Sequence, residues 1–598
     1  MPLDDGALRR VFRLAGEVAC VSLVAGASVG VAQAWPEIVQ GLAAAATSVT
    51  VAKALSGLLW GLAVSLAILI AIGAARLANR GFFQTVLIGL ALVGTPVFLR
   101  VALWVNEHWL PGFLELKSLA WNTAMTVAFV ALLLALVLLV LNRWRAAGRS
   151  GASALWAPWL LVAGLLVVPP FLRDMRPPVF LIVIDALRAD HLGCYGYSRA
   201  TSPNLDRLSR DGVRFTQAIS PSTFTKTSIA SLVTGLDPHF HGVYTGNVED
   251  RTGQITSDVL PSELETLAEV FLRGRYRTMA WIEQVHLTSF HGFAQGYMEY
   301  NEHQGKANDI TNRVLWWTRE RGGTGPFFAH LHVIDLHEPY WPHPPYDRLF
   351  GFYSDVYHGI DLLQWGKYLN EISEGRRSLS AADLDQLRAL YDGQIRYVDE
   401  QLGRLFEQLR RDGLYDRSLI VVTADHGDGF MEHGFISHST VAYEELVRVP
   451  LLMKLPGQRY AGRVVDDQVR LIDVMPTVLE LARLDSPRVS GRSLLPLLEG
   501  RPPGHSEQAV IEFNNPAGVA LRERDWKYIR LVDGRVELYH LADDPGERRN
   551  LAKEAPGELA RFELRVLDIL ARRRSLAAPR VPLDADAIER LKALGYVQ

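Results

Sequence analysis

The hydrophobic residues are spread unevenly along this chain. Long runs without charged residues are concentrated in the first 173 or so positions, at 18–36, 54–75, 81–99, 118–142 and 150–172. Each run has about the 20 residues that a helix needs to cross a hydrocarbon core of about 30 Å. We therefore expect residues 1–175 to form an α-helical membrane domain with about five transmembrane helices.

Arginine residues between these runs predict an orientation. They precede the first run and follow the second and the fourth, as Arg9, Arg10, Arg13, Arg76, Arg80, Arg143, Arg145 and Arg149. The positive-inside rule then places the N-terminus in the cytoplasm and everything after residue 172 outside it. This predicts an integral membrane protein with an extracytoplasmic catalytic domain, in contact with membrane lipid. The uncharged stretch 38–52 leaves an alternative open, because a sixth span there would reverse the orientation.

From about residue 176 the hydrophobic pattern changes. Short apolar runs alternate with longer helical patterns, which is typical of an α/β domain with a largely parallel sheet. Strands are expected at 179–184, 327–334, 419–423 and 449–454, and helices at 203–210, 226–234 and 381–411. After residue 500 two short β-like runs, 509–512 and 526–531, precede a charged helix. We therefore expect a catalytic α/β domain over 176–500 and a small C-terminal subdomain over 501–598.

Composition adds little to this picture. The 62 basic and 65 acidic side chains nearly cancel, so nothing in the charge indicates a nucleic-acid partner. The two cysteines, Cys20 and Cys194, lie in different kinds of segment and are not expected to form a disulfide.

Ionisable residues follow three of the expected strands directly. Asp185 follows the first, Asp335 and His337 follow the second, and Asp425 and His426 follow the third. In open α/β sheets the ligand crevice lies at the carboxyl ends of the strands, so these side chains could converge. Carboxylates with an imidazole suit a divalent cation such as zinc or manganese. A single Asp after a strand is more often only a turn or a helix cap.

A nucleophile is expected in the hydroxyl-rich segment that precedes helix 226–234. The start of a helix offers free backbone N–H groups and the positive end of its dipole, which favour an alkoxide. Such a segment is more often only a helix cap. Spacing alone does not choose among its candidates, which are Ser222, Thr223, Thr225 and Thr227.

Several motifs resemble the sulfatase family of the alkaline phosphatase superfamily, in that family's order over about residues 178–552. They are Asp185-Ala-Leu-Arg-Ala-Asp-His-Leu-Gly193, Thr201-Ser-Pro-Asn-Leu-Asp-Arg-Leu208, Asp335-Leu-His-Glu-Pro-Tyr340, Thr423-Ala-Asp-His-Gly427 and Leu538-Tyr-His-Leu-Ala-Asp-Asp-Pro-Gly-Glu547. The resemblance implies a sulfatase/alkaline-phosphatase-like α/β fold with a small C-terminal subdomain.

Carried over position by position, the resemblance implies roles for individual residues. The metal ligands would be Asp185, Asp425 and His426, together with the nucleophile Thr225. The substrate-side groups would be His337 and His438, which are also candidates for acid–base catalysis. Lys226 could help to hold the anion, although an exposed lysine is the plainer interpretation.

The sequence departs from the sulfatase pattern at the nucleophile. Sulfatases have a Cys or Ser that becomes formylglycine, followed by x-Pro-x-Arg, whereas this chain has Thr225-Lys-Thr-Ser-Ile229. Threonine cannot give the aldehyde. The second Asp of the usual pair is Ala186, so a calcium site is less expected. The set with Thr225 resembles the single-metal site of lipid A phosphoethanolamine transferases and lipoteichoic acid synthases, whereas the C-terminal motifs are closer to sulfatases.

The sequence therefore predicts a metal-dependent hydrolase or transferase that acts on an anionic phosphate- or sulfate-type ester through threonine. The substrate could be lipid- or glycan-linked, and the cofactor is one divalent ion, with zinc or manganese favoured and calcium or magnesium possible. Two alternatives remain: a sulfuric ester hydrolase without formylglycine, and a non-catalytic membrane scaffold with the same fold.

Overall fold

The structure is a computed structural model. It describes residues 176–244, 248–249, 255–302, 305–321, 325–351, 365–373, 375–438, 441–501, 508–513, 518–572, 578–583 and 588. The chain divides into two compact units, 1–173 and 174–598, and all the described residues belong to the second.

The predicted fold class is wrong in its first half. No helix among the described residues is long and apolar enough to cross a membrane. The five expected spans fall in residues 1–173, outside the described residues. That prediction used hydropathy alone, and an apolar run is also compatible with other buried structure. The observed fold class is an α/β domain with a C-terminal subdomain.

An eight-stranded sheet forms the centre of the α/β domain, in the order β12-β2-β11-β8-β1-β7-β5-β6. Strand β1 (Val179–Ile184) lies between β7 (Phe327–Val333) and β8 (Leu419–Thr423) and is parallel to both. All six residues of β1 are buried, as expected for a parallel strand covered on both faces. The other strands are β2 (Val213–Ile219), β5 (Arg277–Ile282), β6 (Glu299–Glu302), β11 (Arg448–Lys454) and β12 (Arg463–Arg470).

The expected strands are all present, and the sheet is largely parallel as predicted. Among its eight strands only β11 runs antiparallel to its neighbours, β8 and β2. The strands expected at 179–184 and 419–423 have those bounds, and the other two differ by one residue at one end.

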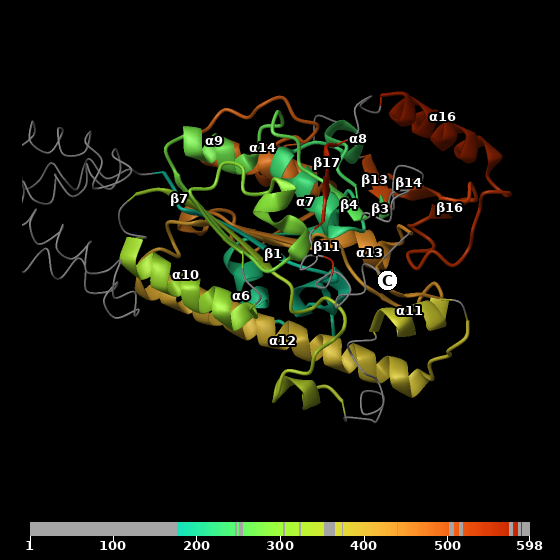
Figure 1. Cartoon of the computed structure of the whole chain (residues 1–598), viewed down its shortest axis with the longest axis horizontal. Helices are drawn as coiled ribbons and strands as arrows, with labels where there is room; N and C mark the ends of the chain where they lie inside the picture. Colours follow the sequence, from blue (N-terminus) through green and yellow to red (C-terminus); the bar gives the residue numbers. More distant parts are fainter. Residues whose placement is uncertain are drawn as a thin grey trace, which may run out of the picture. The chain divides into compact units, whose positions relative to one another are not determined.

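Helices cover both faces of this sheet (Figure 1). On one face lie α6 (Pro203–Asp211), α10 (Ala307–Arg321) and α12 (Ala381–Arg411), and on the other lie α7 (Thr225–Thr234), α9 (Leu267–Arg273) and α14 (Val474–Leu481). Helix α12 has the predicted bounds, and Ser380 begins it with a capping box to Asp383. Shorter helices are α8 (Pro238–His241), α11 (Trp365–Ser373), α13 (Glu444–Val447) and α15 (Leu495–Leu498).

The C-terminal subdomain is a four-stranded antiparallel sheet with a helix on it. Its strands are β13 (Ala509–Phe513), β14 (Gly518–Arg522), β15 (Trp526–Arg530) and β16 (Val536–His540). Helix α16 (Pro556–Arg572) packs Phe562 and Val566 against Tyr528 and Leu538 of this sheet. The sequence predicted two of these four strands and the helix.

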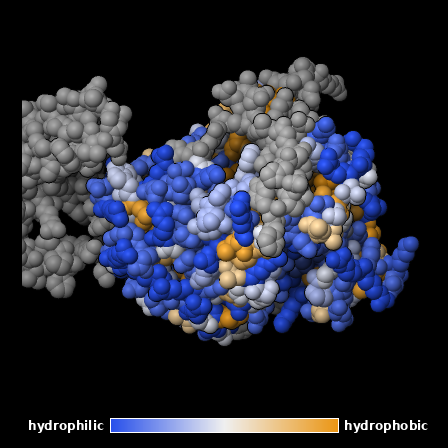
Figure 2. Space-filling model, turned by 90° about the horizontal axis from the view of Figure 1, so that it is seen from below, coloured by the Kyte–Doolittle hydropathy of each residue, from blue (hydrophilic) through white to orange (hydrophobic). Residues whose placement is uncertain are grey.

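Two small sheets complete the described chain. One pairs β9 (Gly429–Phe430) with β10 (Ile436–Ser437). The other joins β3 (Val248–Glu249), β4 (Ile255–Asp258) and β17 (Arg580–Pro582). On the face in Figure 2, hydrophobic residues form separate small groups in a hydrophilic surface, which is ordinary for a protein exterior.

Candidate active site

The ends of β1 and β8 bring three of the predicted site residues together. Asp185 follows β1, and Asp425 and His426 follow the adjacent parallel strand β8. All three side chains are completely buried. The Nε2 atom of His426 lies 3.5 Å from Asp185 Oδ1 and 3.6 Å from Asp425 Oδ2. The expected convergence of these strand ends is therefore observed.

Thr225, from helix α7, lies next to these three residues. It is the first residue of α7 and is 2% exposed. Its Oγ1 atom lies 3.3 Å from His426 Nε2, the same nitrogen that faces both carboxylates. Two carboxylate oxygens, an imidazole nitrogen and a hydroxyl thus surround one point in the protein.

The hydrogen bonds of these residues leave one atom of each directed at that point. His426 Nδ1 lies 2.8 Å from the carbonyl oxygen of Gly427 and donates its N–H there, so Nε2 is the ring nitrogen that faces the carboxylates. Asp425 Oδ1 accepts from the backbone N–H groups of Ala186 and His426, at 3.2 and 3.0 Å. Among the described residues, no donor reaches Asp425 Oδ2 or Asp185 Oδ1. This donor set fits a divalent cation.

Gln284 and His332 complete the surroundings of Asp185, and sequence reasoning missed both. Gln284 Nε2 donates to Asp185 Oδ2 at 2.7 Å, and His332 Nε2 lies 3.3 Å from the same oxygen. His332 also lies near enough to Asp185 and Asp425 to share a metal ion with them. Burial opposes ionisation of Asp185, but the His332 hydrogen bond and the charges of His337 and His426 hold its pKa well below the usual range.

A signal for His332 was present in the sequence. Strand β7 reads Phe-Phe-Ala-His-Leu-His-Val, with histidines at two alternate positions of an otherwise apolar and completely buried strand. Residues two apart on a strand face the same side, and His332 pairs in register with Val183, near the end of β1.

His337 and His438 lie next to this cluster. The ring of His438 stacks on that of His426 with centroids 4.2 Å apart, and the His337 ring meets His438 at 4.8 Å. Glu338 lies between them, with Oε2 3.7 Å from His337 Nδ1 and 3.6 Å from His438 Nδ1. Sequence reasoning missed Glu338. The structure therefore places both histidines where the resemblance implied, and their catalytic roles stay a prediction.

The two histidines differ in charge preference. Burial would lower the pKa of His337, but the negative charges of Glu338 and Asp185 raise it to about 9. The pKa of His438 is lowered, chiefly by burial and then by the charge of His426. At neutral pH His337 is the proton donor of the pair and His438 is neutral.

Lys226 is not an exposed lysine, so the plainer interpretation of this residue is wrong. Its side chain is 2% exposed, and its ammonium donates to Ser257 Oγ and, at 3.2 Å, to the carbonyl oxygen of Asp258. Burial lowers its pKa to about 7, although Asp258 opposes this shift. Its role in substrate binding stays a prediction.

Asp335 lies away from the cluster although it also follows a strand. Its Oδ2 accepts from the backbone N–H of Ala307 at the start of α10, at 2.8 Å, and its Oδ1 faces His343 Nε2 at 3.4 Å. For this residue the helix-cap interpretation is the observed one.

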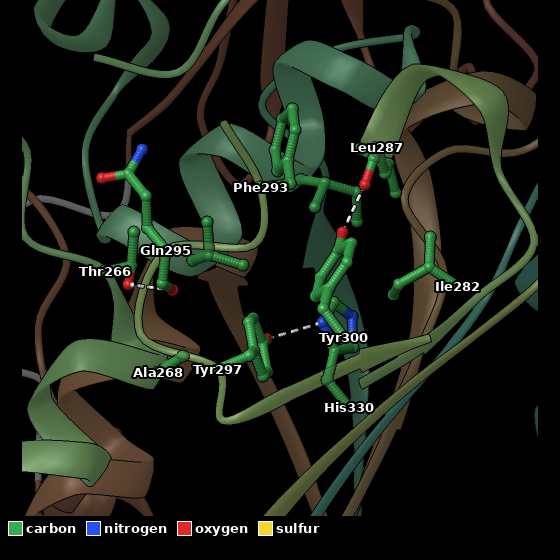
Figure 3. A pocket seen from close by; sticks show the side chains of 11 residues that line it. Thr266, Ala268, Ile282, Leu287, Phe293, Gln295, Tyr297, Tyr300 and His330 are labelled. Atoms are coloured by element: carbon green, nitrogen blue, oxygen red, sulfur yellow. Dashed lines mark hydrogen bonds between the residues drawn. The ribbon is translucent and has the colours of Figure 1, made fainter. Parts of the chain in front are cut away.

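A small cavity lies beside α7, in the core (Figure 3). Its lining includes Ile229 and Val233 of α7, and the hydroxyl of Tyr297 points to His330 Nδ1 at 2.9 Å. Its volume of about 10 Å³ suits about one water molecule, so it is not a substrate pocket.

Comparison with known proteins identifies the family. Residues 177–484, more than half of the chain, match the model of the family described as Sulfatase. The chain belongs to the sulfatase family. Residues 431–566 also match the model described as N-sulphoglucosamine sulphohydrolase, C-terminal.

Relatives of this sulfatase-family chain have both phosphatase and sulfatase names. It is 26% identical over 475 residues to the multifunctional alkaline phosphatase superfamily protein PehA of Trinickia caryophylli, covering 63% of this chain and 91% of that protein. It is 26% identical over 454 residues to an arylsulfatase of Clostridium perfringens, covering 63% and 90%. The phosphonate monoester hydrolase of Agrobacterium radiobacter has the same fold, with a TM-score of 0.55, 23% identity and coverage of 68% and 100%.

This chain is therefore an ester-hydrolysing enzyme that acts on sulfate or phosphate esters. Sulfatases are generally metal-dependent, and the cluster around Asp185 supplies candidate ligands. The alternative of a non-catalytic scaffold is wrong, because the family is one of hydrolases and the chain retains ionisable groups at the strand ends.

Proposed function

We propose that this sulfatase-family enzyme cleaves a phosphate-type ester with Thr225 as its nucleophile, and that one divalent cation is held by Asp185, Thr225, Asp425 and His426. The observation that carries the proposal is the position of His426 Nε2, which faces Thr225 Oγ1 at 3.3 Å and two carboxylate oxygens at 3.5 and 3.6 Å. Two other hydroxyls of this segment have different partners, because Ser220 and Ser228 both donate to the carbonyl oxygen of Asp425.

The cation would lower the pKa of the threonine hydroxyl and offset negative charge on the transferred group. Zinc or manganese suits a set with one imidazole, whereas calcium and magnesium prefer ligands that are all oxygen. Zinc or manganese is therefore the metal that we propose.

The protein residues supply the remaining steps. Thr225 Oγ1 gives its proton to solvent water as it attacks phosphorus, and the bond from phosphorus to the leaving oxygen breaks, which gives a phosphothreonine. The leaving oxygen takes a proton from His337, whose raised pKa keeps it protonated at neutral pH, with His438 as the second candidate. Water or an acceptor hydroxyl then attacks phosphorus and gives its proton to the now neutral His337. The bond from phosphorus to Thr225 Oγ1 breaks, and solvent water returns a proton to this oxygen. The N-terminus of α7 favours the anion throughout.

A sulfate ester is the second candidate substrate. It is favoured by the similarity to the Clostridium arylsulfatase and by the match of residues 431–566 to a sulphohydrolase model. Other relatives are named for ulvan or N-acetylglucosamine-6-O-sulfate chemistry, which makes a sulfated glycan the natural form of this alternative. Comparing kcat/KM for an aryl phosphodiester, an aryl phosphomonoester and an aryl sulfate decides between the two candidates.

The location of the substrate belongs to the same proposal. We propose that the catalytic domain works outside the cytoplasm on a lipid- or glycan-linked ester, supported by the relatives that are named for glycan substrates. A reporter fused after Gln598 that is active on only one side of the membrane tests this location. Reporter activity on the cytoplasmic side would contradict it.

The test of the nucleophile is Thr225→Ala against Thr227→Ala. Thr227 lies two residues further along α7 and is equally buried, so it controls for damage to the helix. We expect Thr225→Ala to abolish turnover and labelling of the protein by substrate phosphate while the domain stays folded. Turnover that survives in Thr225→Ala and is lost in Thr227→Ala would move the assignment.

A further inference from the structure

The last strand of the described chain lies on the catalytic domain and not on the C-terminal subdomain. After α16, β17 pairs antiparallel with β4, with Arg580 opposite Asp258 and Pro582 opposite Thr256. Backbone hydrogen bonds continue the pairing on either side, from Val259 N–H to the Pro579 carbonyl oxygen at 2.8 Å and from Leu583 N–H to that of Ile255 at 2.9 Å. Residues more than 300 positions apart thus form one small sheet.

Strand β4 in turn contacts the beginning of α7. The Lys226 ammonium donates to Ser257 Oγ and to the carbonyl oxygen of Asp258, both on β4. Lys226 directly follows Thr225 in the first turn of the helix. Figure 1 shows β17 beside β4, with α7 next to them. A continuous path of contacts therefore leads from the C-terminal strand to the proposed nucleophile.

Arg580 fixes the middle of this path. Its Nε atom donates to Asp258 Oδ1 at 3.0 Å, and Asp258 Oδ2 accepts from the backbone N–H of Tyr244 at 3.0 Å. Both oxygens of this buried carboxylate are thereby held, and the same residue provides the carbonyl oxygen that receives Lys226. The Arg580 side chain itself is 45% exposed, so its replacement leaves no cavity in the core.

We propose that Arg580 is a positioning residue for catalysis, which through Asp258 and Lys226 fixes the first turn of α7 and so the place of Thr225. Strand β17, which we call the strap, then holds β4 in place and through it the first turn of α7. This inference rests on the proposed function, because it assigns the effect to the nucleophile. Loss of the strap should slow the chemical step more than it weakens substrate binding, since a displaced nucleophile affects only the reacting geometry.

The experiment uses the full chain with Arg580→Ala, Arg580→Lys and the control Arg565→Ala. Arg565 is also ion-paired, to Glu523, and its side chain is 44% exposed, but it lies on α16. We expect kcat to fall about 10-fold in Arg580→Ala with KM changed less than about twofold. Arg580→Lys should restore most of kcat, and Arg565→Ala should match the wild type. Wild-type kcat in Arg580→Ala, or an equal loss in Arg565→Ala, would overturn the proposal.

A double-mutant cycle with Lys226→Met tests the path itself. If Arg580 acts through Lys226, Arg580→Ala adds no further loss of kcat once Lys226 is Met, whereas independent effects multiply. If the two losses of kcat multiply, the positioning role of Arg580 is overturned, while the proposed function stays intact. Full activity in Thr225→Ala removes the proposed function instead, so the two failures are distinguishable.

Discussion

Two of the groups of buried charged side chains in the described part of the chain are built differently. One is the strand-end cluster around Asp185. The other lies where the C-terminal sheet meets the catalytic domain, and we call it the seam cluster: Glu444, Arg522, Lys527 and Glu547. Glu444 begins α13, whereas Arg522 and Lys527 belong to β14 and β15.

In the seam cluster every carboxylate has a cationic partner. Glu444 Oε1 accepts from Arg522 Nε at 2.9 Å and from Lys527 Nζ at 3.1 Å. Lys527 Nζ also lies 2.9 Å from Glu547 Oε1. The formal charges of two acids and two bases cancel in this group, although Glu547 Oε1 has an ion-pair contact and not a hydrogen bond.

In the strand-end cluster the balance is different. Asp185 Oδ1 and Asp425 Oδ2 have no hydrogen-bond donor among the described residues, and they face the Nε2 atom of His426, next to the hydroxyl of Thr225. Leaving buried acceptors unsatisfied costs about 1–3 kcal/mol each, and more when they are charged. Among the described residues no lysine or arginine pairs with Asp185 or Asp425. The lack of a cationic side chain, and not burial of charge as such, therefore distinguishes the proposed metal site from the seam cluster.

The sharpest test of this difference is Asp425→Asn. It removes one charge from the strand-end cluster, while the amide oxygen can still accept the two backbone N–H groups. We expect metal content and kcat/KM to fall together, the latter by more than about 10²-fold, without a lower unfolding midpoint for the metal-free protein. Elemental analysis of the purified protein and steady-state kinetics measure both. Unchanged metal content with lost activity would assign Asp425 another role.

Glu444→Gln is the matching change at the seam. It leaves Arg522 and Lys527 buried without one of their partners, at side-chain exposures of 4% and 0%. Breaking such a pair costs about 3–5 kcal/mol, so the midpoint of denaturant unfolding should fall clearly. Metal content should stay at the wild-type level. If metal is lost before the protein unfolds, the two clusters are coupled and the distinction fails.

A smaller effect is expected from the buried glutamines that serve the two clusters. Gln284→Leu removes the donor to Asp185 Oδ2 and should weaken metal affinity about 10- to 100-fold. Gln468→Leu, whose amide nitrogen donates to the Arg522 carbonyl oxygen at the seam, is the control and should leave metal affinity unchanged. Titration of metal-free protein with zinc measures the affinity. Equal losses in the two variants would mean that Gln284 acts only through general packing.

The remaining prediction is a pH dependence in the strand-end region. Burial would lower the pKa of His337, but Glu338 and Asp185 raise it to about 9, above the unfolded value of 6.5. The stabilisation is therefore full below about pH 6.5 and is lost as the pH rises through about 9, by at most about 3 kcal/mol. In metal-free protein, His337→Gln should reduce the loss of unfolding free energy between pH 6 and pH 9.5. An identical loss in His337→Gln and in the wild type would contradict the assignment of this pH dependence to His337.

The sequence predicted much of this fold because hydrophobic periodicity is a local property. The apolar runs at 179–184 and 419–423 gave strands with those bounds, and the pattern over 381–411 gave α12. It failed for β14 and β16, which are only five residues long and include glycine or charged residues among the apolar ones. The predicted membrane domain rested on the same kind of signal, and it is not found in the described residues.

The sequence predicted a site residue only where that residue directly follows a strand or begins a helix. Asp185, Asp425 and His426 follow strands directly, and Thr225 begins a helix, so their convergence followed from the topology of a parallel sheet. Asp335 has the same kind of position and yet caps α10, because its strand is followed by a different loop. The residue pattern alone did not distinguish a member of the strand-end cluster from a helix cap.

The sequence by itself determined which segments are strands and helices, and that hydroxyl, carboxylate and imidazole groups stand at their ends. Only the tertiary structure decided that Gln284 and His332 contact one oxygen of Asp185 and leave the other without a hydrogen bond. It also decided that Arg580 donates to Asp258. The reason is physical. Periodicity and caps depend on neighbours a few residues away, whereas the completion of a hydrogen-bond set depends on atoms brought together by packing.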